Sequence, residues 1–404
     1  MLSQDTVTAP MPIVGFNETV VHQKSRLRIL RIIARMNVGG PAIQITGLMK
    51  NLDNREFEQL LVTGYCHENE IDYLQEHEIV LPTKKIEGLG QRISLVEDFR
   101  AFLEVRKTIK SFEPDIVHTH TAKAGVLGRL ATLTIRKKIK RVHTFHGHLL
   151  HGYFGKATTK LVILTERFLA FFTHALIAVG EQVKFDLIQA GVGKARKFHV
   201  IGPGLQIGEL PEREEAASIL GISPHDFTVS WIGRAVDIKA PHRILEIARQ
   251  CKDREMNVRF LFVGDGPLRK QLEIDSQRDQ LRVTFVGWQN EIEVVLGASN
   301  LVILTSLNEG TPVALIQAQL AGIPVLATKA GSTSEVLLDD VSGYALPYSK
   351  ELFAARINEF FINPQKCKDF GEKGRVFAMS KFSTQKLVDS HAELYTKLVN
   401  QSNF

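Results

Sequence analysis

The amino-acid sequence predicts an α/β protein with two domains, each built on a parallel, doubly wound sheet. The chain has 404 residues, which is more than one ordinary hydrophobic core organises. Short apolar runs alternate with helical stretches along most of the chain, as expected for strands joined by crossover helices. An apolar fraction of 44% and a charged fraction of 23% are typical of a globular protein in water.

The first domain is predicted to cover residues 25–205. Residues 1–24 contain two prolines and little periodicity, and we interpret them as a loose tail. Leu27–Ala34 opens the domain as a strand, and a glycine-rich turn leads from it into a helix that ends near Leu52. The elements predicted after it are strand 58–63, helix 95–111, strand 115–118, helix 125–135, strand 141–145, a helical stretch 157–172, strand 175–179, a helix from 181 and strand 197–201.

The second domain is predicted to cover residues 206–378. Gly202-Pro203-Gly204 and the acidic segment 209–215 have the composition of a linker into it. Residues 379–404 carry a closing amphipathic helix, expected at 383–398. The strands of the second domain are expected at residues 227–232, 259–263, 283–286, 301–305 and 323–327.

The segment Leu301–Glu335 is predicted to form a binding edge of the second sheet. The apolar run at its start is a buried strand, the residues after Thr305 interrupt it, and a helix follows up to about Ala321. A strand, a loop and a helix N-terminus in this order present free N–H groups at the carboxyl edge of a parallel sheet. Phosphate groups bind at such edges.

The first turn of this helix supplies the candidate ligand contacts. Thr311 is expected to cap the helix, with Pro312 in its first turn, where a missing N–H costs nothing. Glu309 precedes the helix and Gln317 lies about a turn and a half inside it, so both can face the same crevice. The segment therefore predicts the floor of a site for an anionic ligand.

Two cations follow an earlier strand of the same domain. Gly233-Arg234 ends the strand that contains Trp231, and Lys239 comes five residues after the arginine. Cations beside a helix N-terminus can neutralise a diphosphate without a metal ion, the arginine by bidentate hydrogen bonds and the lysine as a point charge. The alternative is that both are ordinary solvated side chains.

Three glycine turns complete the pattern of loops at strand ends. Gly39 and Gly40 follow the first strand of the chain, and their lack of a Cβ lets a ligand approach the backbone. In the second domain, Val263–Pro267 and Phe285–Trp288 each end a strand in a glycine turn. Trp288 is expected either to cover the core or to stack on a base, and core cover is favoured slightly.

Histidines gather near strand ends of the first domain. A zinc site is disfavoured, because no cysteine lies nearby and no HExxH pattern is present. Hydrogen bonding or acid–base work at the cleft between the domains is the preferred interpretation. The histidines are His118, His120, His143, His146, His148 and His151.

The four second-domain motifs, in this order over residues 231–335, resemble those of the retaining glycosyltransferases of family 4. The resemblance implies the GT-B fold, in which two Rossmann-like domains face a central cleft, with the C-terminal helix packing back on the first domain. Gly-Arg, four residues, Lys is the family's phosphate-binding pattern. The family also has Glu, seven residues, then a second Glu, whereas this chain has Glu309 and Gln317.

The resemblance also implies a role for each candidate residue. Arg234 and Lys239 would hold the phosphates of a sugar nucleotide, together with the helix tip, and Glu309 would grip the hydroxyls of the sugar. An amide at position 317 would bind the ribose diol about 1–2 kcal/mol less tightly than a carboxylate. His146 would lie near the reacting sugar. The remaining candidate contacts are Gly39, Gly40, Trp288, Gly310, Thr311, Pro312 and Val313.

Charge is unevenly distributed along the chain. Residues 1–205 hold 28 Lys and Arg against 19 Asp and Glu, and the remaining residues hold 22 against 25. The basic run 136–141 and the cations of the aromatic-rich helix 157–172 suggest a peripheral contact with an anionic membrane. A solvated basic surface is the alternative. No module for nucleic acids is recognised.

The sequence therefore predicts a retaining glycosyltransferase that needs no cofactor and no metal ion. We expect it to move a hexose or N-acetylhexosamine from a nucleotide diphosphate sugar, expected to be UDP-linked, to a cell-surface polysaccharide or lipid-linked acceptor. Three isolated cysteines and the absence of a signal peptide suggest the cytoplasm, with possible attachment to the inner face of its membrane. Two alternatives stay open: a sugar-nucleotide epimerase of the same fold, and a sugar-nucleotide-binding protein that has lost turnover.

Overall fold

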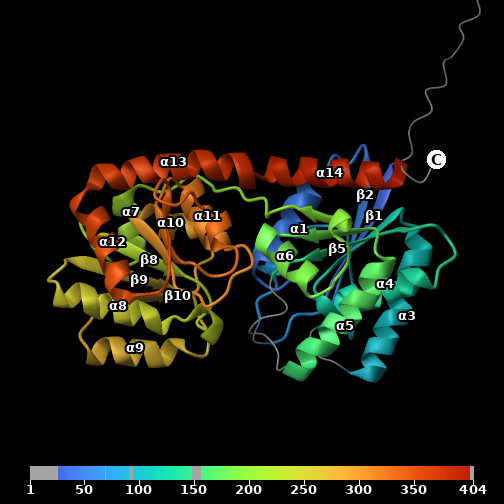
Figure 1. Cartoon of the computed structure of the whole chain (residues 1–404), viewed down its shortest axis with the longest axis horizontal. Helices are drawn as coiled ribbons and strands as arrows, with labels where there is room; N and C mark the ends of the chain where they lie inside the picture. Colours follow the sequence, from blue (N-terminus) through green and yellow to red (C-terminus); the bar gives the residue numbers. More distant parts are fainter. Residues whose placement is uncertain (1–25, 69, 91–93, 148–155, 401–404) are drawn as a thin grey trace, which may run out of the picture.

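Two parallel sheets with helices on both sides form the molecule (Figure 1). The computed structural model describes residues 26–68, 70–90, 94–147 and 156–400, and the tail at 1–24 lies outside them. We call residues 27–200 together with the last helix the first lobe, and residues 205–382 the second lobe. The predicted fold class, two parallel-sheet α/β units, is confirmed.

The first lobe contains a seven-stranded sheet in the order β3-β2-β1-β4-β5-β6-β7. Its strands are β1 (Leu27–Ile33), β2 (Phe57–Thr63), β3 (Thr83–Lys85), β4 (Ile116–His120), β5 (Lys140–Phe145), β6 (Ala175–Ala178) and β7 (Phe198–Val200). Its helices are α1 (Gly40–Asn51), α2 (Tyr73–Glu76), α3 (Leu95–Phe112), α4 (Ala122–Leu133), α5 (Lys156–Phe172) and α6 (Glu181–Gln189).

The second lobe contains a six-stranded sheet in the order β10-β9-β8-β11-β12-β13. Its strands are β8 (Phe227–Ile232), β9 (Val258–Val263), β10 (Val283–Gly287), β11 (Leu301–Leu304), β12 (Val325–Thr328) and β13 (Gly343–Leu346). Its helices are α7 (Arg213–Ile219), α8 (His242–Asp253), α9 (Arg269–Arg278), α10 (Ile292–Gly297), α11 (Val313–Leu320), α12 (Lys350–Ile362) and α13 (Pro364–Phe382).

Two edge strands were not predicted from the sequence. β3 is the tripeptide Thr-Lys-Lys, which is partly exposed and carries no apolar run. β13 is the tetrapeptide Gly-Tyr-Ala-Leu. Its own residues show no clear strand pattern, and the strand forms by pairing with β12. Both strands need only one neighbour, so weak local patterns suffice for them.

The last helix, α14 (Thr384–Asn400), returns to the first lobe. In Figure 1, α13 and α14 run along one side of the molecule, the first over the second lobe and the next over the first lobe. Leu387, Tyr395 and Leu398 of α14 are buried in one cluster with strand residues of the first sheet. The crossing is held by a hydrogen bond of 2.8 Å from Leu205 N–H to the Phe382 carbonyl.

The strand order places the site. In each sheet the order reverses once, between β1 and β4 in the first lobe and between β8 and β11 in the second. Ligands of doubly wound sheets bind at the carboxyl ends of the strands where this reversal occurs, because neighbouring loops there turn to opposite faces and leave a crevice. The loops that follow β1, β4, β8 and β11 are therefore expected to border the ligand site.

Candidate functional site

The two candidate cations lie on the loop that follows β8. Arg234 is exposed, and no ion pair to it occurs among the described residues. Lys239 Nζ lies 2.5 Å from an Oε of Glu309, which follows β11. The two loops are joined through a 2.8 Å hydrogen bond from Leu307 N–H to the Ile238 carbonyl. The structure thus brings Arg234, Lys239 and Glu309 to one edge of the sheet.

Glu309 is held tightly in its loop. It is 7% exposed, and the Ser306 hydroxyl donates a hydrogen bond to its carboxylate. Its carbonyl accepts from Ser332 N–H at 3.1 Å. Gly331 has a φ of +54°, and a Cβ at that position would come within 2.0 Å of the Glu309 carbonyl oxygen. The carboxylate is therefore held by Ser306 and Lys239, and the backbone that carries it is held by Gly331 and Ser332.

The start of α11 differs from the prediction. Pro312 occupies the N-cap position and makes no side-chain cap, and α11 begins at Val313. The expectation that Thr311 caps the helix is wrong, because its hydroxyl donates a 2.9 Å hydrogen bond to the Val179 carbonyl in the first lobe. The N–H groups of the first turn of α11 are consequently left without a side-chain cap.

One face of α11 points toward the first lobe. A Cβ on Gly40, the first residue of α1, would lie 3.4 Å from a methyl group of Val313. Gln317 lies four residues after Val313, so the two share a face of the helix. Gln317 is partly buried. The loop after β1, with Gly39 and Gly40, thus lies opposite the helix that carries Gln317.

Glycine is required where the lobes touch next to Glu309. A Cβ on Gly310 would come within 2.8 Å of the Gly147 Cα and 2.9 Å of the His146 carbonyl oxygen. The loop after β5 therefore lies directly against the loop after β11. Any larger residue at 310 would push the two lobes apart.

Trp288 is more exposed than the sequence suggested. Its side chain is 40% exposed, so the slightly favoured interpretation as a core cover is wrong. It follows β10, and its indole N–H donates to Asn290 at 2.7 Å. The neighbouring glycine turn after β9 is structural, because a Cβ on Gly264 would meet the Gly233 carbonyl oxygen at 1.9 Å.

The histidines of the first lobe form a buried, neutral group. His118, His120 and His143 are at most 2% exposed. Burial holds the pKa of each of these three well below the ordinary value of 6.5. Burial also lowers the pKa of His146 to about 4. Its Nε2 lies 2.9 Å from Nδ1 of His120. His148 and His151 lie outside the described residues.

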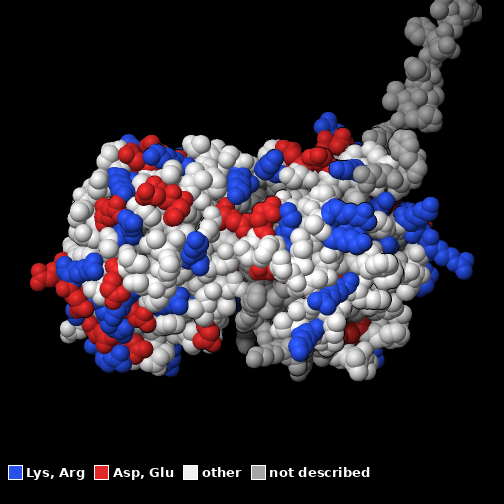
Figure 2. All heavy atoms as spheres, in the orientation of Figure 1, with Lys and Arg blue, Asp and Glu red and all other residues white. Residues whose placement is uncertain are grey.

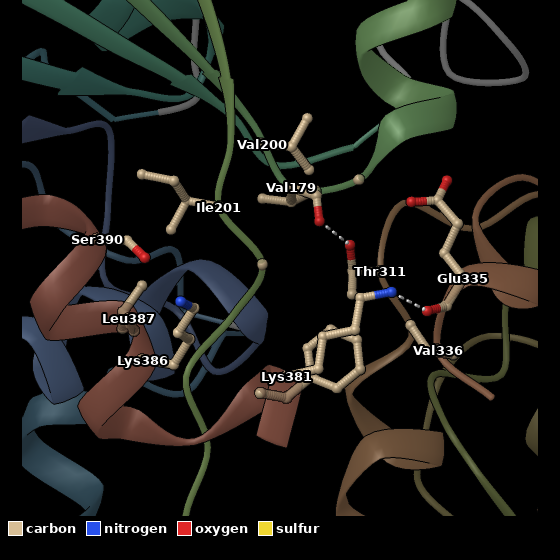
Figure 3. Close-up of a pocket in the computed structure, with 13 residues that line it drawn as sticks. Val179, Val200, Ile201, Thr311, Glu335, Val336, Lys381, Lys386, Leu387 and Ser390 are labelled. Carbon is tan, nitrogen blue, oxygen red and sulfur yellow. Dashed lines mark hydrogen bonds between the residues drawn. The ribbon is translucent and has the colours of Figure 1, made fainter. Parts of the chain in front are cut away.

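Glu335, to which no sequence pattern assigns a role, joins the lobes. Its carboxylate accepts hydrogen bonds from Glu181 N–H at 2.6 Å and Gln182 N–H at 2.7 Å. It thereby caps α6 of the first lobe, where a negative charge is favourable. Glu335 and Thr311 line one side of a cavity of about 140 Å³ between the lobes (Figure 3). The sequence shows here only an acidic residue four positions after Gly331, and this pattern does not predict a contact between lobes.

A second contact between the lobes joins the loop after β10 to the end of α2. The Asn290 amide donates to Glu76 at the end of α2. Asn290 also accepts from Trp288, so the exposed indole is tied to this contact. In the described part of the chain, His, Cys, Asp and Glu do not form a group of three or more that could hold a metal ion. The arrangement offers cations, a carboxylate and helix N–H groups to a ligand between the lobes.

The comparisons with known proteins agree with this arrangement. The family model for group 1 glycosyl transferases matches residues 212–377, and that for Glycosyltransferase Family 4 matches residues 38–208. An Escherichia coli UDP-Gal:α-D-GlcNAc-diphosphoundecaprenol α-1,3-galactosyltransferase is 29% identical over 313 residues, which are 73% of this chain and 77% of the relative. The Staphylococcus aureus capsular polysaccharide glycosyltransferase CapM is 22% identical over 366 residues, 87% of this chain and 89% of the relative.

The fold likeness extends to solved structures. Anabaena HepE, solved in complex with UDP and glucose, superposes with a TM-score of 0.79 at 24% identity, covering 92% of this chain and 100% of the other. The fold and the cleft define a GT-B protein. The chain belongs to the group 1, or family 4, glycosyltransferases, as the resemblance of its motifs predicted.

Proposed function

We propose that this glycosyltransferase moves a hexose or N-acetylhexosamine from a UDP-linked sugar to a lipid-linked or polysaccharide acceptor, with retention of the anomeric configuration and without a metal ion. The observation that carries the proposal is the convergence of Arg234, the Lys239–Glu309 pair and the start of α11 at one sheet edge opposite the first lobe. The two relatives are glycosyltransferases, and the name of one describes the transfer of galactose from UDP-Gal to α-D-GlcNAc-diphosphoundecaprenol.

The charges of the site suit a leaving diphosphate. When the anomeric bond breaks, negative charge grows on the phosphate, and groups already aimed there stabilise the transition state more than the ground state. Arg234 is exposed and has no ion-pair partner in the described ranges, while Lys239 is oriented by Glu309 and can bridge it to a phosphate oxygen. The open N–H groups of α11 add partial positive charge. These three sources of positive charge replace a metal ion in the proposal.

The sugar is proposed to lie between Glu309 and His146. Glu309 is fixed by Ser306 and Lys239, so its second oxygen can accept hydrogen bonds from sugar hydroxyls. A neutral His146 can donate or accept a hydrogen bond without taking part in the charge balance. The leaving phosphate itself then deprotonates the acceptor on the same face of the sugar, which retains the configuration.

A contact with an anionic membrane is proposed for the outer side of the first lobe. Figure 2 shows more Lys and Arg than Asp and Glu over this lobe, whereas the second lobe mixes both signs. Helices α3 and α5 lie on the same side of the lobe (Figure 1). None of the helices in the described ranges is long and apolar enough to span a bilayer. The large apolar side chains that α3 and α5 expose are Leu95, Val96, Phe99, Leu103, Leu161, Leu164, Phe168 and Phe171.

The membrane contact would hold the enzyme at the cytoplasmic face, where a lipid-linked acceptor is within reach. Co-flotation with vesicles that contain an anionic phospholipid tests it at low salt, because attraction between charges weakens as salt rises. We expect the wild type to float and Phe168→Glu/Phe171→Glu to remain in the dense fraction. Equal recovery of both proteins with the vesicles, or of neither, would remove this part of the proposal.

Thermal shift with a panel of nucleotide sugars tests the donor class. At equal concentration a ligand that binds more tightly raises the melting temperature more, so UDP-sugars should stabilise more than GDP- or ADP-sugars. NMR of the product in the presence of an acceptor then reports the anomeric configuration. The same measurement with donor alone identifies an epimerase, which would form a new sugar nucleotide. A protein that has lost turnover would form no product even with an acceptor present. An inverted linkage would refute the retaining mechanism.

A further inference from the structure

A fully buried arginine lies behind the histidines of the first lobe. Arg31, in the middle of β1, is 0% exposed and makes no ion pair with a carboxylate among the described residues. Its guanidinium donates to Gln59 Oε1 at 3.1 Å and to Tyr395 Oη on α14 at 2.8 Å. A guanidinium stays charged in a protein. The structure thus keeps a positive charge in the core without a carboxylate partner among the described residues, and its burial is offset only by hydrogen bonds.

The arginine determines which nitrogen of His118 carries the proton. Nδ1 of His118 lies 3.1 Å from Nη1 of Arg31 and 2.7 Å from the Tyr395 hydroxyl. Arginine can only donate, so Nδ1 must accept, and Tyr395 completes the arrangement by accepting from Arg31 and donating to Nδ1. The proton of the neutral ring is then on Nε2, which donates to Thr144 at 2.7 Å. His118 is left neutral, with its tautomer fixed.

The same reasoning extends to His120 and His146. The rings of His118 and His120 lie 4.2 Å apart, and Nδ1 of His120 is 2.9 Å from Nε2 of His146. Nε2 of His120 is buried and has no hydrogen-bond partner among the residues that the structure describes. A buried N–H without an acceptor is rare in proteins. The proton of His120 is therefore placed on Nδ1, from which it is donated to His146. The neutral ring of His146 then has its own N–H on Nδ1.

We propose that Arg31 and His120 are positioning residues: the charge of Arg31 adds to burial in keeping the histidine row neutral, and His120 fixes His146 as an Nδ1–H tautomer that donates a hydrogen bond to the donor sugar. The last step rests on the proposed function, while the tautomers do not. Tyr395 links the row to α14, so the C-terminal helix takes part in shaping the sugar side of the cleft.

Two carboxylates lie near this row: Glu166, which pairs with Arg129, and Glu309, whose loop packs against that of His146. The other charged or titratable groups that face it do not favour its protonation. They are Arg31 on β1, the neighbouring histidines of β4 and β5, Arg129 beside His143, and His391 and Tyr395 on α14. No carboxylate contributes to the lowered pKa values of these histidines. Protonation of His120 or His146 would add a second buried cation near Arg31.

The tautomers can be measured without any donor. In the full chain labelled with ¹⁵N-histidine, long-range ¹H–¹⁵N spectra at pH 7 distinguish Nδ1–H, Nε2–H and charged rings, and His120→Gln and His146→Gln assign the signals. We expect Nδ1–H for His120 and His146, against the Nε2–H form that free histidine prefers. A charged ring, or Nε2–H on His146, would overturn the inference even in an active enzyme.

Activity variants test the positioning roles. In His120→Asn the amide nitrogen takes the place of Nδ1, and in His120→Gln it takes the place of Nε2. His120→Asn should therefore retain about tenfold more kcat/KM than His120→Gln, which is the value of one hydrogen bond.

Arg31→Met should move the acidic limb of the kcat/KM profile to higher pH, and Arg31→Lys should restore it. If Arg31→Met does not fold, the comparison of His120→Asn with His120→Gln still tests the positioning role. Equal loss in both His120 variants would refute the role of His120. If no donor is turned over by the wild type, the proposed function fails, while the spectra still decide the tautomers.

Discussion

The two lobes share one sheet topology but build opposite edges at the cleft. In the second lobe the edge is ionic: Arg234 is exposed and Lys239 is paired with Glu309. In the first lobe the edge is polar but neutral. Four histidines there have lowered pKa values, and the buried Arg31 behind them forms no ion pair within the described part of the chain. The ionic edge is suited to a diphosphate and the neutral edge to a sugar, whose hydroxyls need hydrogen bonds rather than charge.

Acid should damage the first lobe before the second, and this is the largest effect we expect. Burial lowers the pKa of His146 to about 4 and of His391 to about 3, while the unfolded chain titrates near 6.5. Between these values the unfolded state binds more protons, so the free energy of unfolding falls as pH falls below 6.5. With the other buried histidines, the loss should be on the order of 5 kcal/mol at pH 5.5.

Hydrogen exchange at pH 7 and pH 5.5, corrected for the intrinsic rate, measures this difference. Peptides from β4, β5 and α14 should lose protection, and those from β8 and β11 should keep it. Equal loss in both lobes, or earlier loss in the second, would contradict the contrast between a neutral and an ionic edge.

Arg234→Ala should weaken donor binding by about 100-fold, the value of two charge-assisted hydrogen bonds. Stability should not change, because the side chain is exposed and has no ion-pair partner among the described residues. Calorimetry with the best UDP-sugar gives the affinity. Arg55→Ala in the first lobe, which removes an exposed arginine far along the chain, is the control. If both variants bind like the wild type, Arg234 does not contact the phosphates.

The second-lobe edge was easier to predict than the first. Arg234, Lys239 and Glu309 follow strands that the sequence signals by short apolar runs, so their positions at one sheet edge come from local patterns and the strand order. The first-lobe edge depends on contacts between distant residues. Arg31 and Tyr395 are 364 positions apart, and no local pattern connects them.

The predictions that the structure contradicts, and the contact that the sequence did not predict, share one physical cause. Thr311 was expected to cap α11, but its hydroxyl reaches a carbonyl 132 residues away in the other lobe. Trp288 was assigned slightly toward the core because a large aromatic residue is usually buried, yet the loop after β10 leaves it exposed. Glu335 received no role, since the α6 N-terminus that it caps lies across the cleft. In each case the partner belongs to the other lobe or to solvent, which single-chain periodicity does not report.

Lys239→Met should lower the free energy of unfolding by about 2 kcal/mol, because it leaves the buried Glu309 carboxylate without its cation. This loss is smaller than that expected for a fully buried pair, because Lys239 is 23% exposed and solvent screens its charge. Lys239→Met/Glu309→Gln should recover most of this loss but not donor turnover. Denaturant unfolding of the single and double variants measures it. A double variant as unstable as the single one would mean that the pair is not the cause.

Gln317→Glu should tighten donor binding by about 1–2 kcal/mol, because a carboxylate accepts both ribose hydroxyls in charge-assisted hydrogen bonds. Gln319 offers the matched control: it is fully buried and hydrogen-bonded to Ser342 and the Val336 carbonyl, so Gln319→Glu should cost stability without improving affinity. Calorimetry at constant salt compares the two. Weaker binding in Gln317→Glu would show that position 317 does not face the ribose.

Trp288→Ala should have the smallest effect, a loss of about 1 kcal/mol in donor affinity if the exposed indole stacks on the base. Trp288→Phe keeps a stacking ring but removes the N–H that Asn290 accepts, so it separates stacking from the contact between the lobes. Retained affinity in the Phe variant and a loss in the Ala variant would assign the ring to the base. Equal losses in both would instead assign Trp288 to holding Asn290 against Glu76, and the second lobe would then use its edge for phosphate alone.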